Sequence, residues 1–429
     1  MSMMKIHGNH RLMGEVTICG AKNSTVALIP ATILSDTPVE FDKVPDILDV
    51  HNLMLILQSM NVPSEFSDGI FKVNPTNIKE SRLPSEAIKK LRASYYFMGA
   101  LLGRFHRAIV SFPGGDNIGP RPIDQHIRAF EALGADVTED GDTVYIDATK
   151  HGLKGGIIDF EMVSVGATIN AILAATKADG VTEIHNVAKE PEIVDIVSFL
   201  NSMGAKITGA GTDDIRIEGV KSLSATEIHT VIPDRIEAGT YLALAAAIGD
   251  GILVKNVIPE HLKPFTEKLT EMGLKLEIND DSIFVPESGN IHGVQITTEP
   301  FPGFATDWQQ PITPLLFNAD SDSVITDTIY PKRKKHIHEL KKMGAIIRVT
   351  DNNQIIISPS RDLHGAIVSA GEIRAGASLL IAGLMANGET LITHADHILR
   401  GYDNVVEKLA GLNANVELLE GNVPSASEA

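Results

Sequence analysis

The sequence lacks several features that would place it in common classes of protein. It has one cysteine, Cys19, in 429 residues, which excludes an intrachain disulfide and a zinc site built from cysteines. Its most apolar stretches end at Asp250 and Asn387, too early for a segment that spans a bilayer. The opening residues MSMMKIHGNHRLMGEV have no long apolar core behind a basic head, unlike a signal peptide. We therefore expect a soluble cytoplasmic protein.

An excess of basic residues is also missing. The chain has 37 Lys and Arg against 55 Asp and Glu, a formal net charge of −18. This charge excludes a general attraction to nucleic acid or to an anionic membrane. An anionic substrate would need a local cluster of Arg and Lys within this acidic background.

Motifs for the common cofactors are absent as well. There is no Walker motif, and no Gly-rich dinucleotide fingerprint follows an expected strand. The pairs His336/His338 and His394/His397 lack a third ligand at a sensible spacing, so we interpret them as surface or loop residues. We expect no metal and no cofactor, and Cys19 is most simply a small buried hydrophobe.

What the chain does contain is globular composition and a sixfold repeat. Hydrophobic residues make up 43% and charged residues 21%, and the length suits two domains better than one core. A phrase of Met or Leu, then Gly or Asn, then an alternating apolar strand recurs at steps of 73, 70, 69, 71 and 69 residues. The six phrases are MNVPSEF from Met60, LGADVTE from Leu133, MGAKITG from Met203, MGLKLEI from Met272, MGAIIRV from Met343 and LNANVEL from Leu412.

Each phrase indicates the end of a helix followed by a β-hairpin. Its Gly fits a helix C-cap with positive φ, and Asn61 and Asn413 tolerate the same conformation. A second β-rich run follows the first five phrases: IFKV, TVYI, DIRI, SIFV and QIII. Small-residue-rich apolar stretches between the units predict buried helices. They are SYYFMGALLGRF, ATINAILAATKADG, GTYLALAAAIGDG and GASLLIAGLMANGE.

Six α/β units of about 70 residues divide most naturally into two pseudo-symmetric domains of three units each. The alternative is a solenoid, but about 70 residues is long for a solenoid repeat and the terminal units show no distinct caps. The pattern breaks near EIHTVIPDR. We place one domain at 21–229 and the other at 1–20 plus 230–419, with a tail at 420–429.

The local motifs resemble those of the UDP-N-acetylglucosamine 1-carboxyvinyltransferases, over nearly the whole chain. They include GAKNSTVALIPA from Gly20, LRASYYFMGALLGRF from Leu91, PGGDNIGPRPIDQHI from Pro113, SVGATINAILAA from Ser164, FATDWQQPITPLL from Phe304, IRAGASLLIAG from Ile373 and HILRGYDNVVEKL from His397. The related shikimate-pathway enzymes have Ser-Lys-Ser where this chain has Ala21, Lys22 and Asn23, which disfavours them. The resemblance implies the enolpyruvyl transferase fold, an inverted α/β barrel.

It also implies a reaction. Such an enzyme adds the 3-hydroxyl of UDP-N-acetylglucosamine to C2 of phosphoenolpyruvate, protonates C3 and expels phosphate, in peptidoglycan precursor synthesis. This chemistry needs cations for phosphate and carboxylate, a base for the hydroxyl and an acid for C3. The implied partners are these two small molecules, with no nucleic acid and no membrane; the oligomeric state stays open.

The resemblance assigns Lys22 as catalytic and Asn23 as a substrate contact; taken alone, Lys22 would be a flexible surface lysine after a Gly turn.

Five arginines come from different repeats, and guanidinium groups suit bidentate binding of phosphate and carboxylate. The resemblance places Arg121 and Arg400 around phosphoenolpyruvate, Arg400 being also catalytic, with Arg333 and Arg374 nearby and Arg92 at the active-site loop. Solvated arginines are the plain alternative.

Asp307 corresponds to the carboxylate that contacts the acceptor hydroxyl and acts as its base, although the local sequence alone would suggest an Asx turn. The resemblance also gives a set of UDP-sugar contacts, with main-chain amides of the SVG turn as diphosphate donors. These contacts are Tyr96, Arg121, Pro122, Ile123, Asp124, Ser164, Val165, Gly166, Asp307 and Ile329. Tyr96 stands where the family often has Trp, and Met162 where a basic residue is common.

The loop at 113–122 carries the main departure from the family. Most members have a cysteine at the position of Asp116, where it assists proton transfer and reacts with the epoxide antibiotic fosfomycin. An aspartate here could still be the acid, and it predicts fosfomycin resistance. Two alternatives to the active transferase remain: a diverged paralogue that binds UDP-sugar without turnover, and a transferase for another nucleotide sugar.

Overall fold

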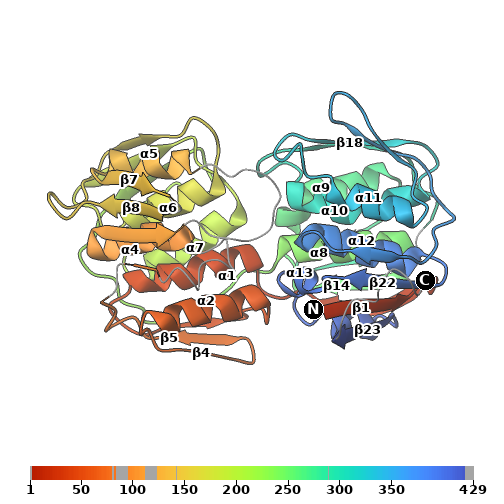
Figure 1. Cartoon of the computed structure of the whole chain (residues 1–429), viewed down its shortest axis with the longest axis horizontal. Helices are drawn as coiled ribbons and strands as arrows, with labels where there is room; N and C mark the ends of the chain where they lie inside the picture. Colours follow the sequence, from red (N-terminus) through yellow and green to blue (C-terminus); the bar gives the residue numbers. More distant parts are fainter. Residues whose placement is uncertain are drawn as a thin grey trace. The chain divides into compact units, whose positions relative to one another are not determined.

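A computed structural model describes residues 2–79, 82–83, 95–111, 123–141, 143–287 and 289–420. These residues form two compact units. The terminal unit consists of the chain up to Cys19 and from Pro233 onward, and the middle unit of the described residues from Gly20 to Ile232. Figure 1 colours the middle unit from red to yellow-green, and the terminal unit carries both chain ends.

One repeat of the middle unit shows the topology that the others share. A strand, a buried helix and a parallel strand are followed by an amphipathic helix and an antiparallel hairpin. The sheet order is β11-β12-β10-β9. The elements are β9 (Ile157–Asp159), α6 (Val165–Ala175), β10 (Val181–His185), α7 (Pro191–Ser202), β11 (Lys206–Thr208) and β12 (Asp214–Glu218).

Two further sheets complete the described part of the middle unit, in the orders β13-β3-β5-β4 and β6-β8-β7. The first contains β13 (His229–Thr230), β3 (Val39–Asp42), β5 (Ile70–Val73) and β4 (Ser64–Ser67), with helices α1 (Lys22–Ala31) and α2 (Leu48–Ser59). The second contains β6 (Arg107–Ser111), β8 (Thr143–Asp147) and β7 (Asp136–Asp140), with α4 (Phe97–Phe105) and α5 (Asp124–Ala132).

The terminal unit repeats this plan in three sheets of its described residues: β15-β16-β14-β2, β17-β18-β20-β19 and β21-β22-β1-β23. The first has β2 (Leu12–Thr17), β14 (Gly249–Lys255), β15 (Glu277–Ile278) and β16 (Ser282–Val285), with α8 (Arg235–Ile248) and α9 (Pro259–Glu271). The second has β17 (Gln295–Thr298), β18 (Ser323–Asp327), β19 (Ile347–Val349) and β20 (Ile355–Ile357), with α10 (Thr306–Ile312) and α11 (Lys335–Lys342). The third has β21 (Ile367–Ser369), β22 (Glu389–Thr393), β23 (Asn415–Glu420) and β1 (Ser2–His7), with α12 (Ile373–Met385), α13 (Asp396–Leu399) and α14 (Val405–Gly411).

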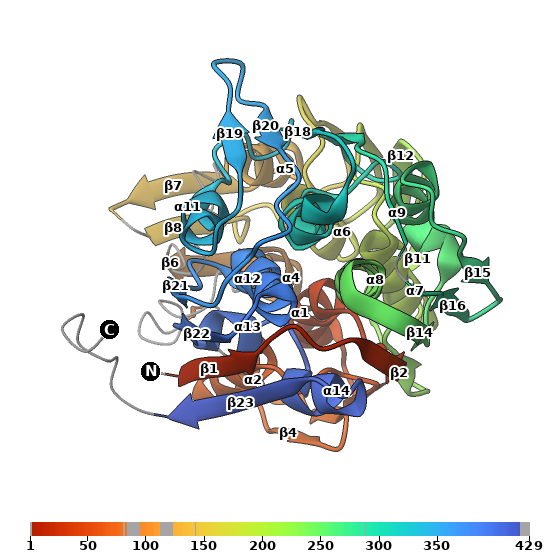
Figure 2. The same cartoon turned by 90° about the vertical axis from the view of Figure 1, so that its right-hand side faces the viewer.

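The repeated phrase ends a helix as predicted. Its four glycines have φ between 85° and 105°, and Asn61 and Asn413 have φ of 59° and 65°. The five β-rich runs are the second strands of the hairpins. In the sixth repeat the N-terminal strand β1 takes that place, because it pairs antiparallel with both β22 and β23. Figure 2 shows β1 between these two strands.

Each unit has its own hydrophobic core around its buried helices. The four predicted buried helices are α4, α6, α8 and α12, and α1 and α10 fill the same place in their repeats. Trp308 on α10 is fully buried and packs edge-on against Phe265 and Phe304. A Cβ on Gly239 would lie 2.4 Å from the Trp308 Nε1, so the close approach of α8 and α10 requires glycine there.

The chain passes between the units at two points, and each passage is fixed by backbone hydrogen bonds within one unit. Asp234 N donates to Cys19 O at 2.9 Å in the terminal unit, and Ala21 N donates to Ile232 O at 2.7 Å in the middle unit. On either side of these passages, β2 pairs parallel with β14 in the terminal unit, and β13 pairs parallel with β3 in the middle unit. In the part of the chain that the structure describes, no helix is long and apolar enough to cross a membrane.

Candidate active site

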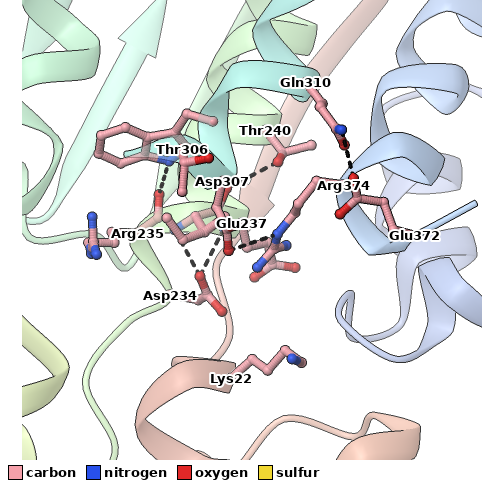
Figure 3. A network of polar contacts seen from close by, with 12 residues as sticks. Lys22, Asp234, Arg235, Glu237, Thr240, Thr306, Asp307, Gln310, Glu372 and Arg374 are labelled. Carbon is pink, nitrogen blue, oxygen red and sulfur yellow. Dashed lines mark hydrogen bonds and ion pairs between the residues drawn. The ribbon is translucent and has the colours of Figure 1, made fainter. Parts of the chain in front are cut away.

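The predicted base lies in a buried cluster of charges in the terminal unit. Asp307 is the second residue of α10, and its Oδ1 accepts a hydrogen bond from Arg333 Nη1 at 2.6 Å. Its Oδ2 accepts one from Arg374 Nε at 3.3 Å. The two arginine side chains are 3% exposed and Asp307 is 27% exposed. The carboxylate is therefore the most accessible part of the cluster, and Figure 3 shows Asp307 next to Arg374.

A second carboxylate, that of Glu372, also binds Arg333. The sequence did not point to this residue. Glu372 accepts from Arg333 Nε at 3.1 and 3.0 Å and from Nη2 at 2.8 Å, and Gln310 Nε2 donates to it at 2.7 Å. Burial alone would lower the pKa of Arg333, but the charges of Asp307 and Glu372 outweigh burial and raise this pKa well above its usual value. Arg333 therefore stays positively charged, and its hydrogen bonds fix the orientation of its guanidinium group.

Arg374 is the second fixed cation of the cluster. Its guanidinium lies over the Tyr402 ring, 5.3 Å from the centroid, and the Tyr402 and Thr240 hydroxyls are hydrogen bonded at 2.9 Å. Burial lowers the pKa of Arg374, whereas Tyr402 and Asp307 raise it, with a net increase. Among the described residues, its buried Nη1 has no hydrogen-bond partner. A buried donor of this kind is costly unless a ligand completes it.

The loop before Arg333 is organised by Asp327, at the end of β18. Its Oδ1 accepts from the backbone N–H groups of Ile329 and Tyr330 at 3.0 and 2.8 Å, and its Oδ2 accepts from Thr306 Oγ1 at 2.7 Å. The predicted contact Ile329 is therefore tied to the start of α10, the helix that carries Asp307. Carboxylates directly after a strand, such as Asp327, were the available signal for this arrangement.

Lys22 and Asn23 begin helix α1 in the middle unit. The Lys22 ammonium forms an ion pair with Asp49 Oδ2 at 3.1 Å; the side chains are 13% and 2% exposed. This ion pair makes Lys22 a half-buried residue and not a solvated surface lysine, and the reach of its ammonium toward a phosphate stays a prediction. Asp49 was not recognised from the sequence; its position in the first turn of an apolar helix gave no signal.

The predicted UDP-sugar contact Tyr96 lies in an aromatic group at the start of α4. The Tyr95 and Tyr96 rings are 4.6 Å apart, and Tyr95 packs edge-on against His126 of α5 at 5.3 Å. A Cβ on Gly166 would lie 3.0 Å from the Tyr95 ring and 3.1 Å from the His126 ring. The structure thus brings Tyr96 and Gly166 into one region, and glycine is needed there for space.

His126 and Asn170 connect this region, although the sequence pointed to neither. His126 Nδ1 lies 3.0 Å from Asn170 Nδ2, and Asn170 Oδ1 accepts from Gly99 N at 2.7 Å. Burial lowers the pKa of His126 to about 4, so its ring is neutral at physiological pH. A neutral His on an amphipathic helix reads as core packing in the sequence, which is why it was missed.

The remaining predicted contacts of the middle unit lie at two helix N-termini. Ser164 caps α6, its hydroxyl accepting from Ala167 N at 3.3 Å, and Val165 and Gly166 form the first turn. Ile123 and Asp124 begin α5. The amides of the SVG turn as diphosphate donors stay a prediction.

Several predictions fall elsewhere. Arg400 is half-buried at the end of α13, two residues before Tyr402. Arg92, Asp116, Arg121 and Pro122 lie outside the described residues. Within the part that is described, no group of three or more His, Cys, Asp or Glu could hold a metal ion.

Two interpretations were wrong. His336 is fully buried on α11, and burial together with Arg333 lowers its pKa to about 3, so it is neither a surface nor a loop residue. His338 lies in the same helix and is exposed, so its interpretation as a surface residue is confirmed. Cys19 is not simply an apolar filler, because its Sγ and its N–H both donate to Glu237 Oε2, at 3.0 and 2.9 Å.

Comparison with known proteins now decides the family. A family model described as EPSP synthase (3-phosphoshikimate 1-carboxyvinyltransferase) matches residues 6–409. UDP-N-acetylglucosamine 1-carboxyvinyltransferase 2 of Lactiplantibacillus plantarum is 65% identical, covering 97% of this chain and 98% of that protein. UDP-N-acetylglucosamine 1-carboxyvinyltransferase of Lactobacillus johnsonii is 58% identical, covering 98% and 100%. The chain belongs to the UDP-N-acetylglucosamine 1-carboxyvinyltransferase family.

Solved structures of this larger group share the fold of the family member described here. The enolpyruvyl transferase NikO from Streptomyces tendae matches with a TM-score of 0.88 at 24% identity, covering 97% of this chain and 98% of its own. EPSP synthase from Acinetobacter baumannii matches with a TM-score of 0.71 at 18% identity, covering 98% and 100%. The predicted enolpyruvyl transferase fold is therefore confirmed.

Proposed function

We propose that this protein transfers the enolpyruvyl group of phosphoenolpyruvate to the 3-hydroxyl of UDP-N-acetylglucosamine and releases phosphate, in peptidoglycan precursor synthesis. The names of relatives that are 65% and 58% identical over nearly the whole chain support this activity. We place the reaction in the cytoplasm, and the aspartate at position 116 supports fosfomycin resistance.

The observation that carries the proposal is the Asp307–Arg333–Arg374 cluster. Two arginines with raised pKa values flank one accessible carboxylate. A buried guanidinium N–H of Arg374 is unpartnered among the described residues, which favours a ligand oxygen at that point. Anionic oxygens of phosphoenolpyruvate or the diphosphate are the acceptors that a guanidinium prefers.

Asp307 is then the base for the acceptor hydroxyl. Each carboxylate oxygen has two lone-pair directions, so Oδ1 and Oδ2 can receive one arginine N–H each and still accept the sugar hydroxyl. The proton leaves as the hydroxyl oxygen bonds to C2, and the adjacent cations stabilise negative charge on the substrate.

The other residues take roles in this proposal according to their chemistry. Lys22, Arg121 and Arg400 bind the phosphate and carboxylate of phosphoenolpyruvate, and Asp116 protonates C3. Asn23, Tyr96 and the residues at the N-termini of α5 and α6 contact the UDP-sugar, and Arg92 acts at the active-site loop.

Omission assays test the proposal. Phosphate should be released only when phosphoenolpyruvate and UDP-N-acetylglucosamine are both present, including after treatment with a chelator. Release with a different UDP-sugar alone would favour the transferase for another nucleotide sugar. Binding of UDP-N-acetylglucosamine without release would favour the non-catalytic paralogue.

A further inference from the structure

A strongly basic stretch of sequence contains Arg333, one of the two arginines that contact Asp307. Six of the eleven residues from Lys332 to Lys342 are Lys or Arg, in a protein of net charge −18. We call this the basic segment; it comprises the loop that contains Arg333 and all of helix α11. It lies in the terminal unit, as does the Asp307 cluster.

Only part of the basic segment is neutralised internally. Arg333 is paired with Asp307 and Glu372, and Lys342 with Glu339 at 2.8 Å. Lys334 Nζ donates to Asn353 Oδ1, which carries no charge. Lys332, Lys335 and Lys341 are exposed, and none of them has an ion pair with another described residue.

The charges in the cluster itself cancel. The two negative charges of Asp307 and Glu372 equal the two positive charges of Arg333 and Arg374. These four side chains therefore produce only a weak electric field beyond the site. Lys332 and Lys334 adjoin Arg333 in the chain, and Lys335 begins α11. The Asp327 carboxylate acts on Lys334, whereas Lys332 and Lys335 have no ion pair with another described residue. Lys332 and Lys335 therefore supply the positive charge that is not neutralised next to the cluster.

We propose that Lys332, Lys334 and Lys335 attract the anionic substrates by long-range electrostatics and raise their concentration at the Arg333 side of the site. The inference rests on the proposed function, since it concerns phosphoenolpyruvate and a UDP-sugar. An acidic protein repels such ligands, and a local basic surface offsets the repulsion. The attraction reaches about one Debye length, roughly 10 Å at 0.1 M salt.

The test is a charge series at Lys332 and Lys335, whose side chains form no hydrogen bond or ion pair among the described residues. Lys332→Gln/Lys335→Gln should raise KM for both substrates about threefold at low ionic strength, with kcat unchanged. Lys332→Glu/Lys335→Glu should roughly square that ratio, because twice the charge is changed. Both effects should vanish near 0.5 M salt, where screening is nearly complete. The matched control is Lys263→Gln/Lys275→Gln, which removes two exposed lysines on or next to α9.

Each outcome decides the question. KM values that stay at the wild-type level, or that match the control, would overturn the inference. A rise in KM that persists at high salt would also overturn it, because it would mean direct contact with substrate. If wild-type protein shows no turnover, the proposed function fails, and calorimetric Kd values for phosphoenolpyruvate, measured in the same variants and salts, still test the attraction.

Discussion

Asp307 lies between two arginines whose positive charges do not depend on pH in the physiological range. Guanidinium groups stay positively charged in this range, so Arg333 and Arg374 can hold an anionic substrate beside the carboxylate. The geometry therefore favours a base that acts while its substrate is held by the same arginines. Charge, and not shape, is the property that this residue must have.

The variant Asp307→Asn tests this point, because it keeps the volume and removes the charge. We expect kcat to fall about 100-fold or more, while the protein stays folded and still binds UDP-sugar in calorimetry. Asp322→Asn is the control, since Asp322 is an exposed carboxylate paired with Arg348 at 3.4 Å. Turnover by Asp307→Asn within a few-fold of wild type would remove Asp307 from the mechanism.

Lys22 combines a proposed chemical role with a structural one. Lys22→Met should abolish turnover, and it should also lower the free energy of unfolding by about 3 kcal/mol, because buried Asp49 loses this cation. The double variant Lys22→Met/Asp49→Leu should recover stability but not turnover, as followed by thermal unfolding and phosphate release. Recovery of both properties would show that Lys22 acts only through the fold.

We propose that Asp116 determines the response to fosfomycin. A thiolate opens the epoxide, whereas a carboxylate is a much poorer nucleophile. We expect wild-type protein to stay active after long incubation, and Asp116→Cys to be active and become covalently inactivated. If Asp116 is the acid for C3, activity should fall with rising pH earlier than in Asp116→Cys, since the reference pKa values are about 3.9 and 8.5.

Mass spectrometry of the intact protein and paired pH–rate profiles separate the two statements. A fosfomycin adduct on the wild-type chain would refute the resistance. Superimposable profiles would refute the role of Asp116 as the acid.

At the scale of elements, a buried histidine on helix α5 allows a test of side-chain packing in the middle unit. Its buried His126 has a pKa of about 4 in the folded protein, against about 6.5 for an unfolded histidine. As pH falls, the unfolded state therefore takes up this proton first. The contribution to stability is complete above pH 6.5 and decreases by up to about 3 kcal/mol toward pH 4.

Urea unfolding at several pH values measures this decrease. His126→Gln should flatten the profile between pH 6.5 and 4, whereas His338→Gln, which changes a side chain that is 79% exposed, should leave the profile unchanged. A profile of His126→Gln with the wild-type slope would show that this ring is not held neutral by burial.

The same scale shows where the sequence predicted structure and where it did not. The helices α8 and α12 could be predicted because their small apolar residues leave no polar face. The helices α1 and α10 could not, since each contains a proline and α10 reads as the polar stretch TDWQQPI. Gln309 and Gln310 are nevertheless fully buried, which only the tertiary packing determines.

Residues that support the site were likewise hidden. Glu372 precedes a helix in an unremarkable position, and its three contacts with Arg333 bring together residues 39 apart in sequence. His336 lies in a run of charges that suggested solvent exposure, but one face of α11 is buried. The resemblance named Asp307 and Arg333, whereas Glu372, which holds Arg333 in place, needed the structure.

At the scale of the whole molecule, the sixfold repeat predicted the two three-repeat units but not which strands complete their sheets. The repeated phrase marks the hairpin of each sheet, whereas the parallel partner strand lies far away in sequence. The pairing of β2 with β14 and of β13 with β3 therefore left no local trace, and neither did the pairing of β1 with β23. The terminal unit is consequently completed by β1 and β2, which precede the middle unit in the sequence.

The central claim, enolpyruvyl transfer to the 3-hydroxyl of UDP-N-acetylglucosamine, is tested most directly by the structure of the product. Proton NMR of a reaction with phosphoenolpyruvate should show the vinylic methylene signals of an enolpyruvyl ether at the sugar 3-position, in one-to-one ratio with released phosphate. Unchanged UDP-N-acetylglucosamine, or an ether at another position, would contradict the account.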